Sequence, residues 1–295
     1  MRCAPVVQTS LILAMVAAHP AQAGVIRHDV DDALYRQLAQ QPQFSAVGAL
    51  GISFTGGGST TCSGTLIGSE WVLTAAHCVD GGFGSASFLT STAFASVAEV
   101  IIHPDWTGNL LGGGDLALLR LSSPVSNIDA AQIHTGGGEL GTVGTIAGYG
   151  RTGTGLTGAQ NGTGGIFRAG HNFIDELGNA RGWDERILLT DFDNPLDPGD
   201  SNYGSDEPLG LEYSIAPGDS GGGLFIETLN GWRLAGVSSF INSTDGNPNG
   251  DYGDSNGFTR VSDYSGWINS IIPAPGTLPI LATGLLGVAR RRRGA

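Results

Sequence analysis

The sequence predicts an all-β fold of barrel or sandwich type that ends in a single helix. The chain has 295 residues and 49 glycines, which cluster between short runs rich in Val, Ile, Leu and Phe. Only residues 261–272 place apolar side chains at helical spacing, namely Tyr264, Trp267, Ile268 and Ile271. A chain of this length forms one large or two small packed units.

Nine short apolar runs are expected to be strands, because glycine or polar turn residues bound each of them. They are residues 44–54, 65–67, 71–74, 97–102, 116–121, 143–147, 187–189, 224–226 and 234–240. A break near residues 130–141 divides the runs into two β units. Residues 152–165 have low complexity and are expected to form a mobile loop.

The first 23 residues have the pattern of a secretory signal peptide. Arg2 is the basic end, residues 11–18 are apolar, and Ala21-Gln22-Ala23 is an A-x-A cleavage site. We therefore expect an exported protein. Cys3 leaves with the signal, and the remaining pair, Cys62 and Cys78, suggests one disulfide.

The last 23 residues form a separate tail. Pro273–Gly276 is a linker, residues 278–289 are apolar, and residues 290–293 are all arginine. The apolar run is shorter than the roughly 20 residues of a membrane-spanning helix. Residues 273–295 resemble the PEP-CTERM sorting signal of bacterial exported proteins, with Ala274 where that motif has Glu. The resemblance implies transient membrane anchoring through sorting machinery, then cleavage and release or attachment to the cell surface.

The charge balance excludes one class of partner. The formal net charge is −13 and the chain contains no lysine. Removing both ends removes five arginines and no acidic residue, which leaves −18. Nucleic-acid binding needs basic patches that neutralise phosphates, so no nucleic-acid partner is expected.

Three motifs carry the chemistry. They are Thr74-Ala75-Ala76-His77-Cys78, Gly114-Asp115-Leu116-Ala117-Leu118-Leu119 and Gly218-Asp219-Ser220-Gly221-Gly222. A serine hydroxyl is a weak nucleophile until a base takes its proton, and a histidine is a suitable base. The order His, Asp, Ser, with Cys62 as the partner of Cys78, resembles the trypsin/chymotrypsin-like serine peptidases over residues 44–272.

The resemblance implies a fold of two six-stranded antiparallel β-barrels, about residues 44–135 and 136–260, with the active site between them. The helix of residues 261–272 closes the domain, and residues 24–43 are an N-terminal segment of the mature protein. The implied function is an exported serine endopeptidase that acts on protein or peptide substrates. We expect a monomer that needs no cofactor.

The resemblance also implies catalytic roles. Ser220 attacks the substrate carbonyl, and His77 takes the serine proton and passes it to the leaving amine. Asp115 fixes the histidine tautomer. The backbone N–H groups of Gly218 and Ser220 form the oxyanion hole.

The same resemblance places four residues at the specificity pocket. Ser214 lies at its base, Ser239 bonds Asp115, Phe240 forms a wall, and Ile241 stands where the family usually has glycine. A pocket for Arg or Lys needs a carboxylate at its base to pair the buried cation. Ser214 and the branched Ile241 therefore predict a preference for small or medium apolar residues.

Asp219 raises a question about activation. In the family a new N-terminus, often Ile-Val-Gly-Gly, inserts and pairs with the aspartate before the nucleophile. This chain lacks that tetrapeptide, and Val25-Ile26-Arg27 is the nearest apolar candidate. Three alternatives stay open: signal removal frees the activating end, Asp219 pairs otherwise, or the protein stays latent.

Two acidic segments have a pattern that is compatible with calcium. Residues 245–251 resemble the start of a calcium loop, but the twelfth position is Asn256 and not a bidentate Glu. The pattern favours a polar hairpin tip over a calcium site. Asp191, Asp193, Asp197 and Asp200 form a second acidic stretch with the same ambiguity, and we assign no metal ligand.

A different class of function is a non-catalytic homologue that serves as a surface binding module or a matrix protein. The sorting tail is compatible with that alternative. The intact set of His77, Asp115 and Ser220 argues against it, because a site released from catalysis tends to lose one of its members.

Overall fold

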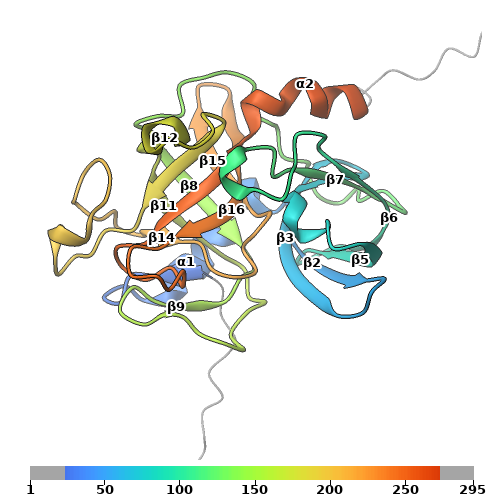
Figure 1. The fold of residues 1–295 in the computed structure, drawn as a ribbon. Coiled ribbons are helices and arrows are strands. Elements are labelled where there is room, and N and C mark those ends of the chain that lie inside the picture. Colours follow the sequence, from blue (N-terminus) through green and yellow to red (C-terminus); the bar gives the residue numbers. More distant parts are fainter. Residues whose placement is uncertain (1–23, 273–295) are drawn as a thin grey trace, which may run out of the picture.

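The computed structural model describes residues 24–272, which form two β units side by side with one helix at each end of the chain (Figure 1). The proposed signal peptide and sorting tail lie outside the described residues. The all-β class, the paired units and the C-terminal helix are confirmed. All nine expected runs overlap strands of the structure.

The first unit is a closed six-stranded antiparallel barrel in the order β2-β3-β4-β7-β6-β5. Its strands are β2 (Val47–Phe54), β3 (Ser59–Gly68), β4 (Trp71–Thr74), β5 (Phe83–Leu89), β6 (Phe94–Ile102) and β7 (Ala117–Leu121). Leu50, Leu66, Phe88 and Leu118 are fully buried inside it. Closure leaves the barrel without free strand edges at which another chain could pair.

The second unit differs from the six-stranded barrel that the resemblance implied. It is a seven-stranded antiparallel sheet in the order β11-β8-β15-β16-β17-β13-β12. Its strands are β8 (Val143–Gly148), β11 (Arg168–Phe173), β12 (Glu176–Leu177), β13 (Ile187–Asp191), β15 (Gly223–Thr228), β16 (Gly231–Asn242) and β17 (Ser255–Arg260). The two residues of β12 extend the sheet by pairing with Leu188 and Leu189 of β13.

A small four-stranded sheet, ordered β10-β9-β1-β14, lies beside the second unit. It contains β1 (Gly24–Ile26), β9 (Thr152–Thr154), β10 (Gly158–Ala159) and β14 (Tyr213–Ser214). Two of its strands belong to the segment of residues 152–165, so the prediction of a mobile loop there is wrong. The segment is held because β9 pairs in parallel with β1 and antiparallel with β10.

The prediction of a single helix is also wrong, because the N-terminal segment contains α1 (Asp32–Ala39). Asp31 caps the helix by accepting a hydrogen bond from the N–H of Ala33. Only Tyr35 and Ala39 of the helix are buried, so the apolar stripe is too narrow to identify from sequence. Asp32 forms an ion pair with Arg168, which is fully buried on β11. This pair attaches the N-terminal segment to the second unit.

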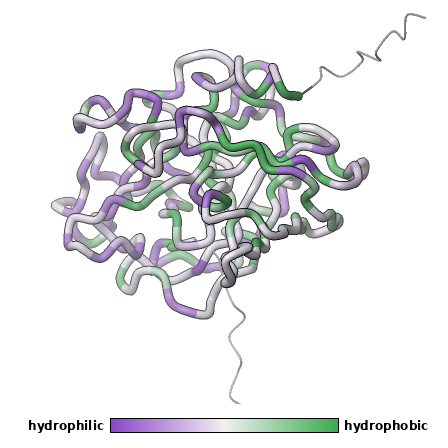
Figure 2. The backbone as a smooth tube through the Cα atoms, turned by 45° about the vertical axis from the view of Figure 1, so that its right-hand side comes forward, coloured by the Kyte–Doolittle hydropathy of each residue, from purple (hydrophilic) through white to green (hydrophobic). Residues whose placement is uncertain are grey.

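The C-terminal helix α2 (Val261–Ile271) buries Val261, Tyr264 and Ile268 in the core cluster that includes the first barrel. No helix among residues 24–272 is long and apolar enough to cross a bilayer. Short 3-10 helices complete the fold: η1 (Pro42–Phe44), η2 (Ala76–Cys78), η3 (Leu110–Gly112), η4 (Gly178–Arg181) and η5 (Pro198–Asp200). In Figure 2 the outer loops are mostly hydrophilic or neutral, and hydrophobic stretches follow the strands.

Candidate active site

His77 and Asp115 meet at the junction of the two units. His77 lies in η2, directly after β4, and Asp115 lies just before β7. The Nδ1 atom of His77 donates to Oδ2 of Asp115 at 2.8 Å, and the backbone N–H of His77 donates to Oδ1 at 2.9 Å. Since the carboxylate accepts from Nδ1, the proton stays there and Nε2 is left as a proton acceptor. This is the tautomer that a general base needs.

Asp115 is held from several directions. Its carboxylate is 1 % exposed, and its Oδ2 also accepts a hydrogen bond from the hydroxyl of Ser239 on β16. The hydroxyl of Thr259 on β17 donates to its backbone carbonyl at 3.0 Å. The second unit therefore fixes the orientation of an aspartate that the first unit carries. The predicted bond between Ser239 and Asp115 is present.

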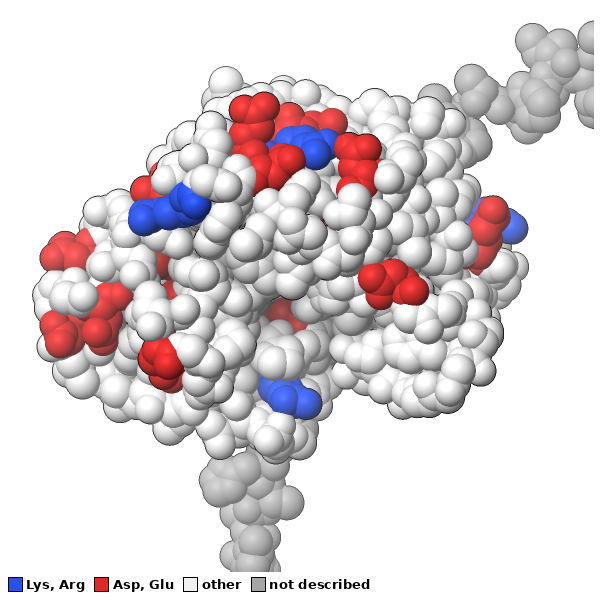
Figure 3. Space-filling view, viewed as in Figure 1, with Lys and Arg blue, Asp and Glu red and all other residues white. Residues whose placement is uncertain are grey.

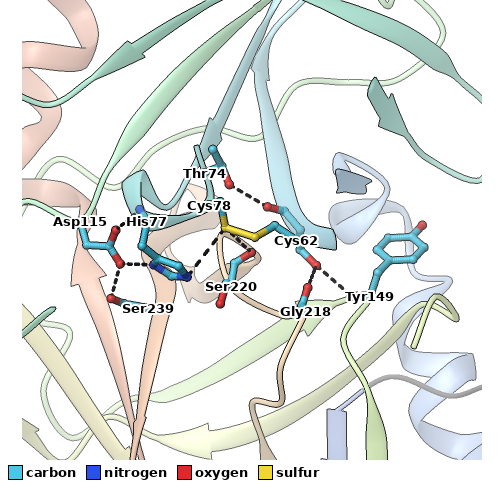
Figure 4. Close-up of a disulfide and its surroundings, with 10 residues drawn as sticks. Cys62, Thr74, His77, Cys78, Asp115, Tyr149, Gly218, Ser220 and Ser239 are labelled. Atoms are coloured by element: carbon cyan, nitrogen blue, oxygen red, sulfur yellow. Dashed lines mark hydrogen bonds and ion pairs between the residues drawn. A yellow bond between two sulfur atoms is a disulfide. The ribbon is translucent and has the colours of Figure 1, made fainter. Parts of the chain in front are cut away.

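Ser220 lies on the other side of the imidazole from Asp115 (Figure 4). Within residues 24–272 no hydrogen bond joins its hydroxyl to His77, whose Nε2 lies 3.9 Å from Sγ of Cys78. Nucleophile–base bonds are often long before substrate binds, so this geometry is compatible with catalysis. The side chain of His77 is 28 % exposed and Ser220 is half-buried, so a substrate can reach both.

The backbone before Ser220 carries the two N–H groups that the sequence predicts for an oxyanion hole. Gly218 has φ of +102°, and a Cβ there would lie 2.9 Å from Cα of Gly150, so both conformation and space require glycine. The backbone N–H of Arg151 donates to the carbonyl of Pro217 at 2.8 Å, which fixes the Pro217–Gly218 peptide plane. Among the described residues the N–H groups of Gly218 and Ser220 donate to no protein acceptor.

Ser63 is a site residue that the sequence analysis missed. Its backbone N–H donates to the carbonyl of Ser220 at 2.8 Å, and its hydroxyl donates to the carbonyl of Gly218 at 2.9 Å. The same hydroxyl accepts from the N–H of Tyr149 at 2.9 Å. One fully buried serine of the first barrel thus holds two segments of the second unit in place. Its position directly after Cys62 was the available signal.

The Cys62–Cys78 disulfide is present, and its two Cα atoms are 6.3 Å apart. It joins β3 to η2, the 3-10 helix that carries His77. Ser63 directly follows Cys62, and His77 directly precedes Cys78. The disulfide therefore restricts the position of the histidine relative to Ser63, which bonds Gly218. Figure 4 shows this arrangement.

Asp219 is fully buried and points away from the catalytic groups. Its carboxylate accepts from the N–H groups of Gly150 at 2.8 Å and Ala216 at 3.0 Å, and from the hydroxyl of Tyr213 at 3.4 Å. Burial without a directly bonded cation raises the pKa of Asp219 to about 7, although these hydrogen bonds oppose the shift. A Cβ at Gly24 would overlap the ring and hydroxyl of Tyr213, so β1 begins beside the same hydroxyl.

The four residues predicted for the specificity pocket lie on β14 and β16, next to β17. Ser214 is fully buried, and its hydroxyl donates to Oδ1 of Asn256 at 2.9 Å. Asn256 also accepts from the N–H of Ile215 and is the cross-strand partner of Ile241. Phe240 lies over Gly257, where a Cβ would overlap its ring. Asn256 thus links predicted pocket positions on β14 and β16, and sequence reasoning missed it because residues 255–260 were not recognised as a strand.

Most acidic side chains of the two segments that suggested calcium accept hydrogen bonds from nearby residues, whereas Oδ1 of Asp193 is buried without a partner among the described residues. Asp245 is exposed and accepts from the hydroxyl of Ser243 and the N–H of Asn247, both at 2.7 Å. Asp191 accepts from the N–H groups of Asn202 and Tyr203, and Asp197 caps η5. In the described part of the chain, Cys62, His77 and Cys78 are the one set of three potential metal-binding side chains whose ligand atoms lie close together. The disulfide accounts for that set.

Charge is unevenly distributed around the site. Figure 3 shows acidic groups gathered over the side of the second unit and fewer charges over the first barrel. A molecule with this excess of acidic over basic side chains repels acidic partners at long range.

Comparison with known proteins agrees with this geometry. The sequence pattern of the family named Trypsin matches residues 39–268. Chymotrypsin-like elastase family member 1 of Felis catus is 31% identical over 233 residues, which cover 72% of this chain and 79% of that protein. Its counterpart in Homo sapiens is 28% identical, with 76% and 86% covered.

Solved structures are similar as well. HL collagenase aligns with a TM-score of 0.56 at 25% identity, covering 78% of this chain and 95% of that one. Mouse neuropsin, a serine protease, aligns with a TM-score of 0.58 at 22% identity and the same coverage, which supports the fold alone. With most of its length matched by the family pattern, the chain belongs to the trypsin family and is a trypsin-like serine endopeptidase.

Proposed function

We propose that the protein is an exported endopeptidase that hydrolyses peptide bonds through Ser220, His77 and Asp115 and an acyl-enzyme. The observation that carries this proposal is the 2.8 Å bond between His77 Nδ1 and Asp115, which leaves Nε2 free on the side of Ser220. Nε2 takes the proton of Ser220 as its oxygen attacks the carbonyl carbon, and later gives it to the leaving amine. The N–H groups of Gly218 and Ser220 bind the oxyanion.

A covalent inhibitor tests this assignment. A serine-directed fluorophosphonate should add its mass to the peptide that contains Ser220, and His77→Ala should abolish the labelling. An Asp245→Asn variant is a matched control, because that carboxylate lies in an exposed loop. A folded sample that begins at Gly24 and takes up no label would instead favour the non-catalytic binding module.

The pocket supports a preference for small or medium apolar residues before the cleaved bond. Ser214 at its base carries no charge, and Ile241 and Asn256 face each other across β16 and β17. Two of the relatives carry the name elastase, which fits the same preference. A buried Arg or Lys side chain would find no carboxylate at the base of this pocket.

A panel of peptides that differ in the residue before the cleaved bond tests this preference. Substrates with Ala or Val before the cleaved bond should be hydrolysed faster than those with Arg or Phe. Ile241→Gly should raise kcat/KM for Phe relative to Ala by about 10- to 100-fold, because the branched side chain no longer narrows the pocket. Ile241→Val is the control and should change that ratio little. Fastest turnover of an Arg substrate would contradict the pocket assignment.

Of the three activation alternatives, we favour signal removal. Cleavage after Ala23 makes Gly24 the first residue, and Gly24 lies against the Tyr213 hydroxyl that also contacts Asp219. The pairing of Val25 with Ser214 and of Gly24 with Thr152 holds this end in the small sheet. The new ammonium group would then supply the cation that the buried carboxylate lacks. No separate propeptide is needed in this scheme.

Export and sorting complete the proposal. Residues 1–23 direct the chain through the inner membrane, and residues 273–295 hold it there until sorting machinery removes them. The protease is then released or stays at the cell surface. Mass spectrometry of the secreted form checks both ends: it should begin at Gly24 and end near Pro273.

A further inference from the structure

Most arginines of the described residues form an ion pair with a carboxylate, and two do not. Residues 24–272 contain nine arginines, and seven of them form an ion pair with a carboxylate: Arg27, Arg36, Arg120, Arg168, Arg181, Arg186 and Arg260. Arg151 and Arg233 have no carboxylate partner within the described residues. The side chain of Arg233 bonds the backbone carbonyl of Trp232, whereas the side chain of Arg151, an exposed residue, bonds only Oδ1 of Asn161 among the described residues, at 2.7 Å.

Arg151 lies next to the oxyanion hole. Its backbone N–H bonds the carbonyl of Pro217, and the preceding residue, Gly150, packs directly on Gly218. Pro217 and Gly218 lie beside the position at which the substrate carbonyl reacts. The guanidinium of Arg151 is therefore close enough to contact substrate residues a few positions from the cleaved bond.

The surrounding bonds define on which side of that bond Arg151 lies. The segment of Gly218–Gly221 is bonded on one side to β16, where the N–H of Gly221 donates to Ser238. It is also bonded to Ser63, which holds Tyr149 as well, and Figure 4 shows Tyr149 on the other side of Ser220 from Ser239 of β16. β16 carries the specificity pocket and hence the acyl part of the substrate. Arg151, two residues after Tyr149, therefore lies on the side of the leaving peptide.

We propose that Arg151 binds a carboxylate on the leaving peptide, within about three residues after the cleaved bond. The inference rests on the endopeptidase activity proposed above. A guanidinium offers five N–H donors, of which the bond to Asn161 uses one, so a two-pronged bond to a carboxylate stays available. The carboxylate comes either from an Asp or Glu side chain or from the C-terminus of a short peptide.

The net charge of the whole molecule also favours an acidic substrate residue at one position only. A protein with a mature charge of −18 repels acidic peptides, and a single exposed cation at the cleft offsets that repulsion locally. The enzyme should therefore accept an acidic residue at the one place that Arg151 reaches, and disfavour acidic residues elsewhere in the substrate.

Internally quenched peptides test the proposal. All carry the same Ala before the cleaved bond and an amidated C-terminus, and they differ by Asp, Ala or Arg at each of the three following positions. At the best position kcat/KM should favour Asp over Arg by about three- to tenfold in the wild type. Arg151→Ala should bring this ratio close to one, and Arg151→Glu should reverse it.

Three further measurements sharpen the result. A peptide with a free C-terminal carboxylate, compared with its amide, separates the terminal carboxylate from a side chain as the preferred ligand. Arg233→Ala removes the same charge at a distant hairpin and should leave the ratio unchanged. A substrate with only a chromophore as leaving group serves to normalise each variant.

The outcomes are distinguishable from failure of the proposed function. If Arg151→Glu hydrolyses peptides with the wild-type ratio of Asp to Arg, the inference is overturned while the endopeptidase stands. If Arg233→Ala changes the ratio as much as Arg151→Ala does, the effect is one of net charge and the inference also fails. If no peptide is cleaved and Ser220 takes up no label, the proposed function itself is wrong.

Discussion

Replacing Ser220 with Ala should lower kcat/KM by about 10⁴- to 10⁶-fold, because it removes the only group that can form the acyl-enzyme. The fold should survive, since Ser220 is held through its backbone carbonyl by Ser63, and a methyl group fits where the hydroxyl was. The measurement is steady-state hydrolysis of an Ala-containing peptide by protein that begins at Gly24. Circular dichroism and thermal unfolding should match those of the wild type.

Asp115→Asn is the matched variant that separates positioning from nucleophilic attack. An amide can donate to Nδ1 and so favours the wrong histidine tautomer, with an expected loss of about 10⁴-fold. An amide nitrogen in the place of Oδ2 also removes the acceptor for the hydroxyl of Ser239, whereas the remaining oxygen still accepts from the N–H of His77. Activity of Ser220→Ala within tenfold of the wild type would contradict the catalytic assignment and indicate a different nucleophile.

The second large effect concerns the N-terminus. A chain with one extra residue before Gly24 should be about 10²- to 10³-fold less active than one that begins at Gly24. The extension turns the nitrogen of Gly24 into an amide and moves the ammonium group away, so the carboxylate of Asp219 stays buried without a cation, which is costly. The two forms can be compared after cleavage from a removable leader. In an Asp219→Asn background they should be equally active, and a persistent difference there would exclude pairing with Asp219.

The pH dependence of stability should differ between these two forms. In the extended chain burial raises the pKa of Asp219 to about 7, from 3.8. Between these values the folded chain holds a proton that the unfolded chain has lost, so its stability falls as pH rises through this window. Pairing with the ammonium of Gly24 lowers the carboxyl pKa and removes that fall. Urea unfolding at pH 5 and pH 8 measures the difference.

Much of the fold could be predicted because buried strands in this chain are short apolar runs between glycines. The strands that were missed, such as β1, β14 and β17, are short or rich in polar residues and are identified only by their pairing. Helix α1 was missed for a related reason. It is held by Asp32 and the distant Arg168, and such a pair across 136 positions leaves no local pattern.

The site divides in the same way. His77, Asp115 and Ser220 stand in motifs whose chemistry requires those residue types, so the sequence identifies them directly. Ser63 and Asn256 act through bonds to backbone groups of remote segments, and no spacing in the sequence indicates those bonds. The surroundings of Asp219 likewise depend on the pairing of β1 with β14.

The Cys62–Cys78 disulfide has a consequence for inactivation. It connects two parts of the first barrel, so within residues 24–272 no covalent link besides the main chain joins the unit that carries His77 to the unit that carries Ser220. The distance between His77 and Ser220 consequently depends on noncovalent contacts at the interface between the two β units, above all the hydrogen bonds of Ser63. These contacts can break while the first barrel and the seven-stranded sheet both stay folded. Heating should therefore abolish turnover several degrees before the β signal in circular dichroism is lost, and cooling should restore it.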